Sequence, residues 1–228
     1  MLTLGVDVAA GALRAAQRLR LKDDVLAVLR DAIIAGKFAP GERLNEKDLA
    51  EQLGTSRGPI RDSLAALAHE GLVVHEPHKG ARVPLLDKAD IEDVYTLRVA
   101  LETLAARTAV ERARAADFDA LDHALSDLAK AFEKGDRRGI TDADLRFHDA
   151  FYQAAHHDRL SVAWRTVRSQ VALCLFSRNT VSATSREIVV DEHVHLLDLL
   201  RTRSESALVD AVRAHIETAY QRLVASYD

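Results

Sequence analysis

The sequence predicts a mainly α-helical protein in which a winged helix-turn-helix, with a small β-hairpin as its wing, is followed by an all-α bundle of six helices. Of the 228 residues, 48% are hydrophobic but only 5% are aromatic, a composition typical of helices packed through alanine and leucine. Beyond residue 87, apolar residues recur with helical spacing, and no stretch alternates as a strand would.

A helix-turn-helix is predicted between Leu44 and Val73. The apolar spacing at its start fits one face of a short helix, and Gly54 ends that helix. Ser56 can cap the second helix, and Pro59 falls in its first turn, where no intrahelical N–H is needed. The first helix would bury Leu44, Leu49, Ala50 and Leu53, and the second would bury Ile60, Leu64 and Leu67.

The second helix presents two arginines from its N-terminal turns. Arg57 and Arg61 are four residues apart, beside the apolar stripe. A guanidinium matches the O6/N7 edge of guanine, and it can instead clamp phosphates. After Gly71, two short apolar runs flank Pro77-His78-Lys79-Gly80, which predicts a hairpin with Lys79 near its tip. Together these features predict a winged helix that binds double-stranded DNA; the alternative is a helical hairpin with surface arginines.

The sequence divides into three parts. We expect residues 1–21 to form a flexible arm, because a terminus of this kind is seldom ordered. Residues 22–84 would form the winged helix-turn-helix domain. The junction is predicted just before Asp87, which can cap a long helix. Breaks in the helical pattern divide residues 87–226 into about six helices, which is enough for a bundle with its own core.

Charge and cysteine content narrow the classes of function. The net charge of −4 and the pI of about 6.2 argue against a non-specific DNA coat and fit a specific binder with a small positive footprint. The single cysteine, Cys174, excludes an intrachain disulfide and suits a reducing cytoplasm, where we expect the protein to act. No apolar run approaches about 18 residues, so no membrane span is predicted.

Helical phase places one aspartate and three histidines on inward faces of three predicted helices. Asp144 and His148 are four residues apart, on a face that continues with apolar side chains. His193 lies on a leucine-rich face, whereas His195 points the opposite way. His215 also shares its face with apolar residues. A lone aspartate on such a face is costly to bury unless something pairs with it.

These four side chains offer what a divalent transition metal needs, namely neutral imidazole nitrogens, a hard anionic oxygen and a dry surrounding. We therefore expect a metal site at Asp144, His148, His193 and His215. Zinc is the first candidate, and nickel, manganese and iron also accept these ligands. Taken singly, each histidine would more simply be a hydrogen-bonded core residue.

The N-terminal part resembles the winged-helix domain of GntR-type bacterial regulators. The family pattern is I-x-x-G, then P-G-x-x-L-x-E-x-x-L-A, then S-R-x-P-V-R-x-A-L and E-G-L-V. The matching residues are Ile33, Gly36, Pro40, Gly41, Leu44, Glu46, Leu49, Ala50, Ser56, Arg57, Pro59, Arg61, Leu64 and residues 70–73. The chain departs at Gly58, where Thr is common, and at Asp62-Ser63, where Glu-Ala is common. The resemblance implies DNA contacts through Lys47, Ser56, Arg57, Arg61, Lys79 and Gly80.

The rest of the chain is similar to the FCD ligand-binding domain of FadR-like GntR regulators. The motifs that carry the similarity are L-R-x-x-L-E at Leu97–Glu102, D-x-x-F-H at Asp144–His148, E-H at Glu192-His193 and R-A-H at Arg213–His215. In the metal-binding branch of that family, the Asp and the three His are the ligands. The resemblance therefore implies the same four residues that helical phase selects.

A carboxylate effector could complete the coordination of such a metal, and Arg98 could clamp it. The alternative for Arg98 is a surface ion pair with Glu102, four residues on. The resemblance implies that the effector is a small organic acid or related metabolite. We thus expect a metabolite-responsive regulator, a repressor rather than an activator, which binds a pseudo-palindromic operator as a homodimer.

Three other interpretations remain open. The ion itself could be the signal, or the bundle could serve only for dimerisation. The bundle could also be a metal-dependent hydrolase fused to a DNA-binding module. Against the hydrolase, the sequence shows no further carboxylate or histidine placed to act as a base, since Glu192 is offset from His193 by about 100° around the helix.

Overall fold

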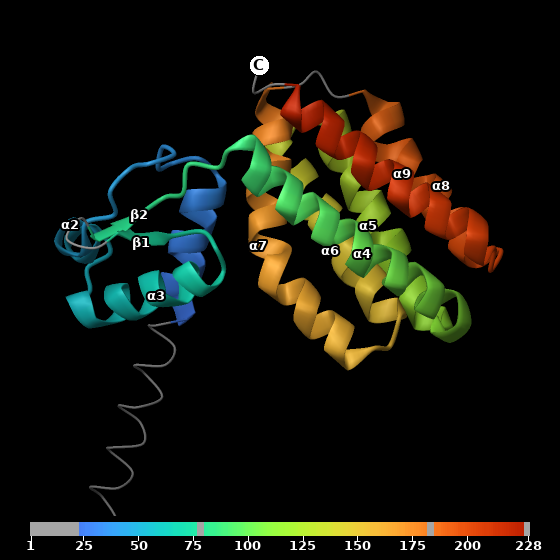
Figure 1. Cartoon of the computed structure of the whole chain (residues 1–228), viewed down its shortest axis with the longest axis horizontal. Coiled ribbons are helices and arrows are strands. Elements are labelled where there is room, and N and C mark those ends of the chain that lie inside the picture. The colour runs from blue at the N-terminus through green and yellow to red at the C-terminus, as the bar shows by residue number, and fades with distance from the viewer. Residues whose placement is uncertain (1–22, 77–79, 182–184, 226–228) are drawn as a thin grey trace, which may run out of the picture. The chain divides into compact units, whose positions relative to one another are not determined.

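A computed structural model describes residues 23–76, 80–181 and 185–225. Backbone contacts divide the chain between Leu85 and Leu86 into two compact units (Figure 1). The fold is mainly helical, and its described strands form one small antiparallel sheet, as the sequence predicts. The predicted arm at residues 1–21 lies outside the described residues.

The N-terminal unit is a winged helix-turn-helix. A helix that includes residues 23–34 is followed by α2, Glu46–Gln52, and α3, Arg57–His69. The wing consists of β1, Val74–Glu76, and β2, Gly80–Arg82. The two strands are antiparallel, with Val74 opposite Arg82 and Glu76 opposite Gly80. The apolar stripe predicted for α3 is confirmed, because Ile60, Leu64 and Leu67 are all fully buried.

The ends of α2 and α3 differ from the sequence prediction in detail. Helix α2 begins only after Asn45, whose side chain accepts a hydrogen bond from the Lys47 N–H, so Leu44 is buried ahead of the helix rather than within it. Leu53 is the residue that ends α2, and Gly54 then takes a positive φ of 61°, a conformation that glycine adopts without strain. Ser56 stands at the N-cap position of α3, but its side chain makes no capping hydrogen bond.

The C-terminal unit consists of helices. Its elements are α4, Lys88–Arg112; α5, Ala115–Glu133; α6, Arg137–Ala154; α7, Asp158–Val181; a π-helical turn η1, Glu187–Asp191; α8, Glu192–Arg201; and α9, Glu205–Val224. Asp87 caps α4 as predicted, in a reciprocal capping box with Asp90 whose two hydrogen bonds measure 2.9 and 3.0 Å. The π turn was not predicted. It leads directly into α8, the helix that carries His193.

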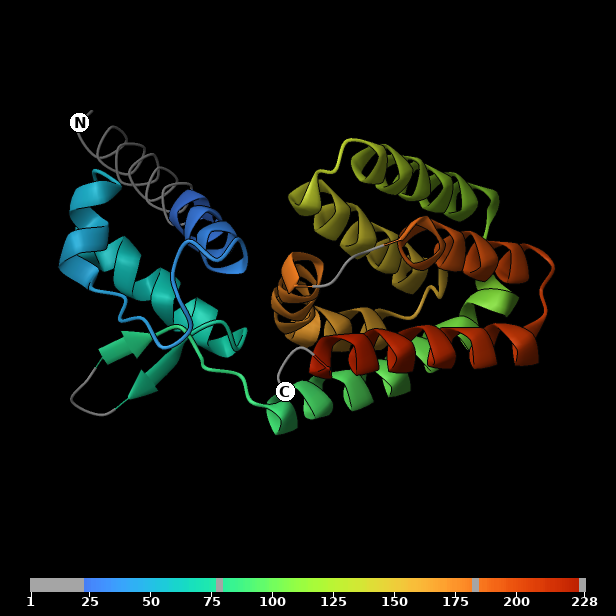
Figure 2. The same ribbon diagram turned by 90° about the horizontal axis from the view of Figure 1, so that it is seen from above.

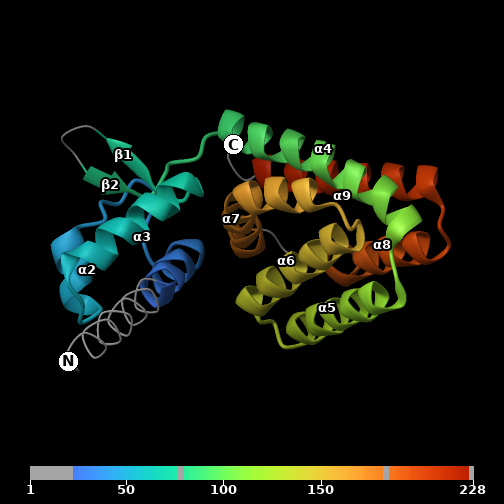
Figure 3. The ribbon, with the colours of Figure 1, turned by 90° about the horizontal axis from the view of Figure 1, so that it is seen from below.

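Helix α6 lies inside the bundle, between its neighbours. It packs against α5, α7 and α4, and α4 also packs along α9 (Figure 2). Helix α5 lies on the side of the bundle away from α4 (Figure 3). The histidine-bearing faces of α6, α8 and α9 therefore meet α4 within one core. No helix in the described part of the chain is both long and apolar enough to cross a membrane.

Candidate functional site

The first candidate surface is the exposed face of the helix-turn-helix. Arg57 and Arg61 are exposed on α3, beside its buried stripe. Ser56 is exposed beside them. Lys47 on α2 is exposed as well, with its Nζ 3.8 Å from a carboxylate oxygen of Glu51. This face combines cationic side chains with a hydroxyl at the start of a helix, where backbone N–H groups favour anions.

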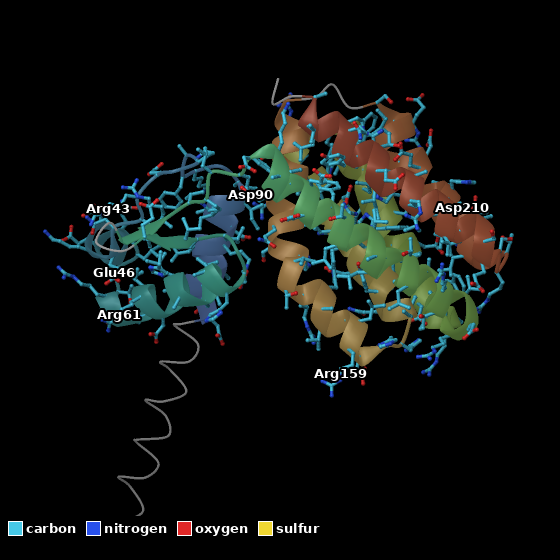
Figure 4. The ribbon with its side chains drawn as sticks, viewed as in Figure 1. Arg43, Glu46, Arg61, Asp90, Arg159 and Asp210 are labelled. Atoms are coloured by element: carbon cyan, nitrogen blue, oxygen red, sulfur yellow. The ribbon has the colours of Figure 1, made fainter. Side chains whose placement is uncertain are left out.

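The described part of the wing includes one of its two predicted contact residues. Lys79 lies outside the described residues, and Gly80 has a positive φ of 83°. Arg82 is half-buried, because its Nη1 donates to the Gly41 carbonyl at 3.0 Å. Arg43 was missed. A Cβ placed on Gly80 would lie 3.8 Å from the Arg43 guanidinium, so this exposed arginine lies beside the hairpin, at the same end of the unit as Arg61 (Figure 4).

The second candidate is a buried cluster of three histidines in the C-terminal unit. His148 of α6, His193 of α8 and His215 of α9 each offer a ring nitrogen, and these nitrogens lie within 4.8 Å of one another. The ring centroids are 4.7 to 5.6 Å apart. All three side chains are buried. Three helices distant in sequence thus bring three imidazoles to one point.

Asp144 lies beside two of these histidines. Its Oδ1 is 3.5 Å from His148 Nε2, and its Oδ2 is 3.7 Å from His193 Nε2. The carboxylate is only 2% exposed. Its position one turn before His148 on α6 accounts for the first contact, and the packing of α8 against the core accounts for the second. The four side chains that the sequence selected therefore lie together.

Two glutamates contact the Nδ1 atoms of two of these histidines. His148 Nδ1 is 2.8 Å from Glu102 Oε2, and His215 Nδ1 is 2.7 Å from Glu192 Oε2. Both contacts engage Nδ1 and leave Nε2 as the ligand nitrogen, which is the arrangement found around protein-bound metals. The sequence indicated no further carboxylate placed to act as a base, and it did not reveal that two carboxylates lie against the ligand histidines. Glu192 turns away from the His193 face, but it reaches His215 on the neighbouring helix.

The charges of these groups are set by burial and by pairing. Burial alone would raise the pKa of Glu192, but the His215 hydrogen bond and Arg222 outweigh it and lower that pKa to about 2. The pKa of His215 is lowered, chiefly by burial and partly by the charge of Arg98, which favours the neutral ring. A neutral imidazole is the form that binds metal.

Arg98 does not form the surface ion pair that was one alternative. It is fully buried, and its Nε donates to Glu102 Oε1 at 2.6 Å. Its Nη2 lies 2.7 Å from His148 Nε2. Burial raises the pKa of Glu102, but the positive charge of Arg98 and the His148 ring reverse the effect and hold it at about 2. Arg98 is thus an ionised core residue in direct contact with a predicted metal ligand.

Several buried polar atoms in and around this network have no hydrogen-bond partner among the described residues. They include Arg98 Nη1, Tyr152 Oη and His148 Nδ1, whose approach to Glu102 at 2.8 Å is a close polar contact and not a well-aligned hydrogen bond. The Tyr152 ring is held in place by Trp164, with ring centroids 4.6 Å apart and an interplanar angle of 12°. Buried donors without partners are uncommon and call for an explanation such as a ligand or water. A separate surface pocket of about 270 Å³ between α8 and α9 has His215 and Glu192 in its wall.

Comparison with known proteins gives the same two-part division. Residues 21–83 match the model of the bacterial regulatory proteins of the gntR family, and residues 93–218 match that of the FCD domain. The Nta operon transcriptional regulator of Aminobacter aminovorans is 31% identical over 189 residues, which cover 82% of this chain and 87% of that protein. The HTH-type transcriptional repressor RspR of Escherichia coli is 25% identical, covering 86% of each chain.

Solved structures agree with this result. The Escherichia coli McbR/YncC structure superposes with a TM-score of 0.80 at 25% identity, over 91% of this chain and 99% of that one. The relatives are transcriptional regulators and not enzymes, so the hydrolase alternative is not supported.

Proposed function

Since this chain belongs to the GntR family of bacterial regulatory proteins and is a transcriptional regulator with an FCD domain, we propose that a small carboxylate controls its affinity for operator DNA through a metal site in the helical unit. The protein would act in the cytoplasm, as a homodimer on a pseudo-palindromic operator. We further propose that it represses transcription, as RspR does by name.

The proposed DNA contacts are Lys47, Ser56, Arg57, Arg61, Lys79 and Gly80. Arg57 and Arg61 support the proposal most directly. Both are exposed at the start of α3, and neither forms an ion pair with any described residue. Their guanidinium groups are therefore available for guanine edges or phosphates. The exposed Ser56 hydroxyl, which caps nothing, is available for a phosphate oxygen. Arg43 is a further candidate next to the wing.

The proposed metal ligands are Asp144, His148, His193 and His215. The observation that supports them best is the pair of glutamate contacts to His148 Nδ1 and His215 Nδ1. A carboxylate at Nδ1 fixes the proton there, so that the Nε2 lone pair points to the metal. Three buried nitrogens and a carboxylate suit zinc first, and nickel, manganese or iron as alternatives. Bound metal would supply a positive centre that attracts an anionic ligand.

The proposed effector site adjoins the metal. Arg98 is placed to bind a carboxylate, because its Nη1 donor is buried without a partner in the described chain. Tyr152 offers a second such group, a hydroxyl that burial keeps protonated by raising its pKa. A small organic acid could therefore be held by the metal, by a guanidinium and by a phenol.

The proposed dimer surface includes the outer face of α4. Leu97 and Leu104 are 45% and 44% exposed, and they are seven residues apart, so they lie on the same side of the helix. Exposed leucines in line on a long helix suit contact with a second copy of the chain.

The test is a set of operator-binding titrations. An operator selected from random DNA would be titrated with the metal-free protein, with zinc-loaded protein, and with zinc-loaded protein plus a panel of small organic acids. We expect a change in operator affinity only when metal and one class of acid are both present. DNA affinity that follows zinc alone would instead make the ion the signal. Unchanged affinity in every condition would contradict the switching mechanism.

A further inference from the structure

The contact between Arg98 and His148 defines which nitrogen of His148 carries a proton. A guanidinium can only donate hydrogen bonds. At a distance of 2.7 Å from Arg98 Nη2, His148 Nε2 must therefore be the acceptor. The proton of the neutral ring is then on Nδ1, which faces the ionised carboxylate of Glu102 at 2.8 Å. Each nitrogen of this buried ring therefore lies against a charged side chain, Nε2 against Arg98 and Nδ1 against Glu102.

The Nε2 lone pair has two possible partners. It accepts from Arg98 in this structure, yet it is also the nitrogen that faces Asp144 Oδ1, at 3.5 Å, and thus the rest of the ligand set. One lone pair cannot serve a guanidinium and a metal at once. We propose that Arg98 keeps the metal site closed, and that its guanidinium must leave His148 before the site can take a cation. This proposal rests on the metal site of the proposed function.

An anion can draw Arg98 away from His148. The Nε–Glu102 hydrogen bond, at 2.6 Å, anchors the guanidinium at one side. The outer nitrogens are less constrained, because among the described residues Nη2 contacts His148 and Nη1 has no hydrogen-bond partner. A carboxylate matches two guanidinium nitrogens with two parallel hydrogen bonds. A carboxylate bound there would free His148 Nε2, so metal and carboxylate should strengthen each other's binding.

The first experiment removes Arg98, which competes with the metal for His148 Nε2. Zinc affinity would be measured by competition with a chromophoric chelator, in chloride buffer without any carboxylate, for the full-length wild type and for Arg98→Met. We expect zinc to bind about tenfold more tightly to Arg98→Met, since a charge-assisted hydrogen bond no longer has to be broken. Arg201→Met is the matched control, because Arg201 pairs with Asp122 at 2.6 Å at the surface. Its zinc affinity should equal that of the wild type.

A second variant covers the case in which Arg98→Met does not fold, because Glu102 loses its cation. Arg98→Met with Glu102→Gln removes both charges, and the Gln carbonyl can still accept from His148 Nδ1. The same gain in zinc affinity is expected. Folded variants that bind zinc no more tightly than the wild type would overturn the proposal, whereas the metal site of the proposed function would stand. No zinc binding by any of the proteins would overturn both.

The second experiment measures the coupling. Formate, acetate and benzoate would each be added at constant ionic strength, and zinc affinity measured again. In the wild type we expect at least one of them to tighten zinc binding, and zinc to tighten the binding of that acid by the same factor, as linkage requires. In Arg98→Met the acids should have no such effect. An equal effect in both proteins, or none in either, would contradict the role of Arg98.

Discussion

The arginines of the two units are placed in opposite ways. Arg57 and Arg61 on α3 are exposed and form no ion pair with a described residue, whereas Arg98 on α4 is fully buried and contacts both Glu102 and His148. The exposed arginines contribute little to the stability of the fold, so their guanidinium groups are available to bind another molecule. The buried arginine is part of the core, and any movement of it rearranges its neighbours. This difference separates the proposed DNA-binding surface from the proposed effector site.

The largest effect should come from breaking the buried pair. Replacing Glu102 with Ala leaves the Arg98 charge without its carboxylate, and loss of one partner of a buried pair costs about 3–5 kcal/mol. The free energy of unfolding from urea denaturation measures this loss. Asp122→Ala is the control, because it removes an exposed pair with Arg201 that is worth about 0–1 kcal/mol. Equal losses in the two variants would contradict the difference between buried and exposed pairs.

The converse prediction concerns Arg61. Its replacement by Ala should weaken operator binding by about 1–3 kcal/mol, the range for loss of one arginine–base contact, and leave the unfolding free energy unchanged. Fluorescence anisotropy with operator DNA measures the first quantity. Arg159, an exposed arginine of the C-terminal unit, provides the control (Figure 4). Operator affinity that survives Arg61→Ala would remove Arg61 from the contact surface.

The next prediction concerns Glu192, which contacts the proposed ligand His215 but is not itself a proposed ligand. Glu192→Gln weakens the orienting contact to His215 Nδ1, and loss of such a partner typically lowers metal affinity about 10–100-fold. Chelator competition gives the zinc dissociation constant. Glu187→Gln, an exposed change in the π turn, should leave that constant as it is. If both variants bind zinc like the wild type, then Glu192 does not support the site.

The smallest effects are expected from two glycines. A Cβ on Gly58 of α3 would meet nothing within 4 Å, so Gly58→Ala should stabilise the protein by up to about 1 kcal/mol through lower unfolded-state entropy. In α6, a Cβ on Gly139 would collide with the Asp136 carboxylate and lie 3.1 Å from Ala131 Cβ. Gly139→Ala should therefore be destabilising. Melting temperatures would be compared for the two variants and the wild type. A lower melting temperature for Gly58→Ala would contradict the open space around Gly58.

The sequence predicted which helix faces point inward better than it predicted side-chain contacts between helices. Helical phase was enough to place Asp144 and His148 inward, because residues four apart share a face whatever the rest of the fold does. It could not place Glu192, because that carboxylate contacts His215 across two helices, and such a contact depends on how α8 and α9 pack. Glu102 was read only as a partner of Arg98, since spacing along one helix does not reveal a third residue from α6.

Local details at helix ends were also beyond the sequence pattern. The cap at Asp87 was predicted, but its reciprocal hydrogen bond with Asp90 was not. The absence of a capping hydrogen bond from Ser56 could not be predicted either, because it depends on the side-chain rotamer. The π turn at Glu187–Asp191 follows from no periodicity in the sequence, and yet it sets the start of the helix that carries His193.

The central claim is that the histidine cluster holds a transition metal. The most direct measurement is the metal content of the full-length protein purified without chelator, by elemental analysis. The account predicts about one ion per chain in the wild type and almost none after His193→Ala, in line with three-nitrogen sites in which each ligand is needed. A wild-type protein that contains no metal, and whose melting temperature does not rise on adding zinc, nickel, manganese or iron, would contradict it.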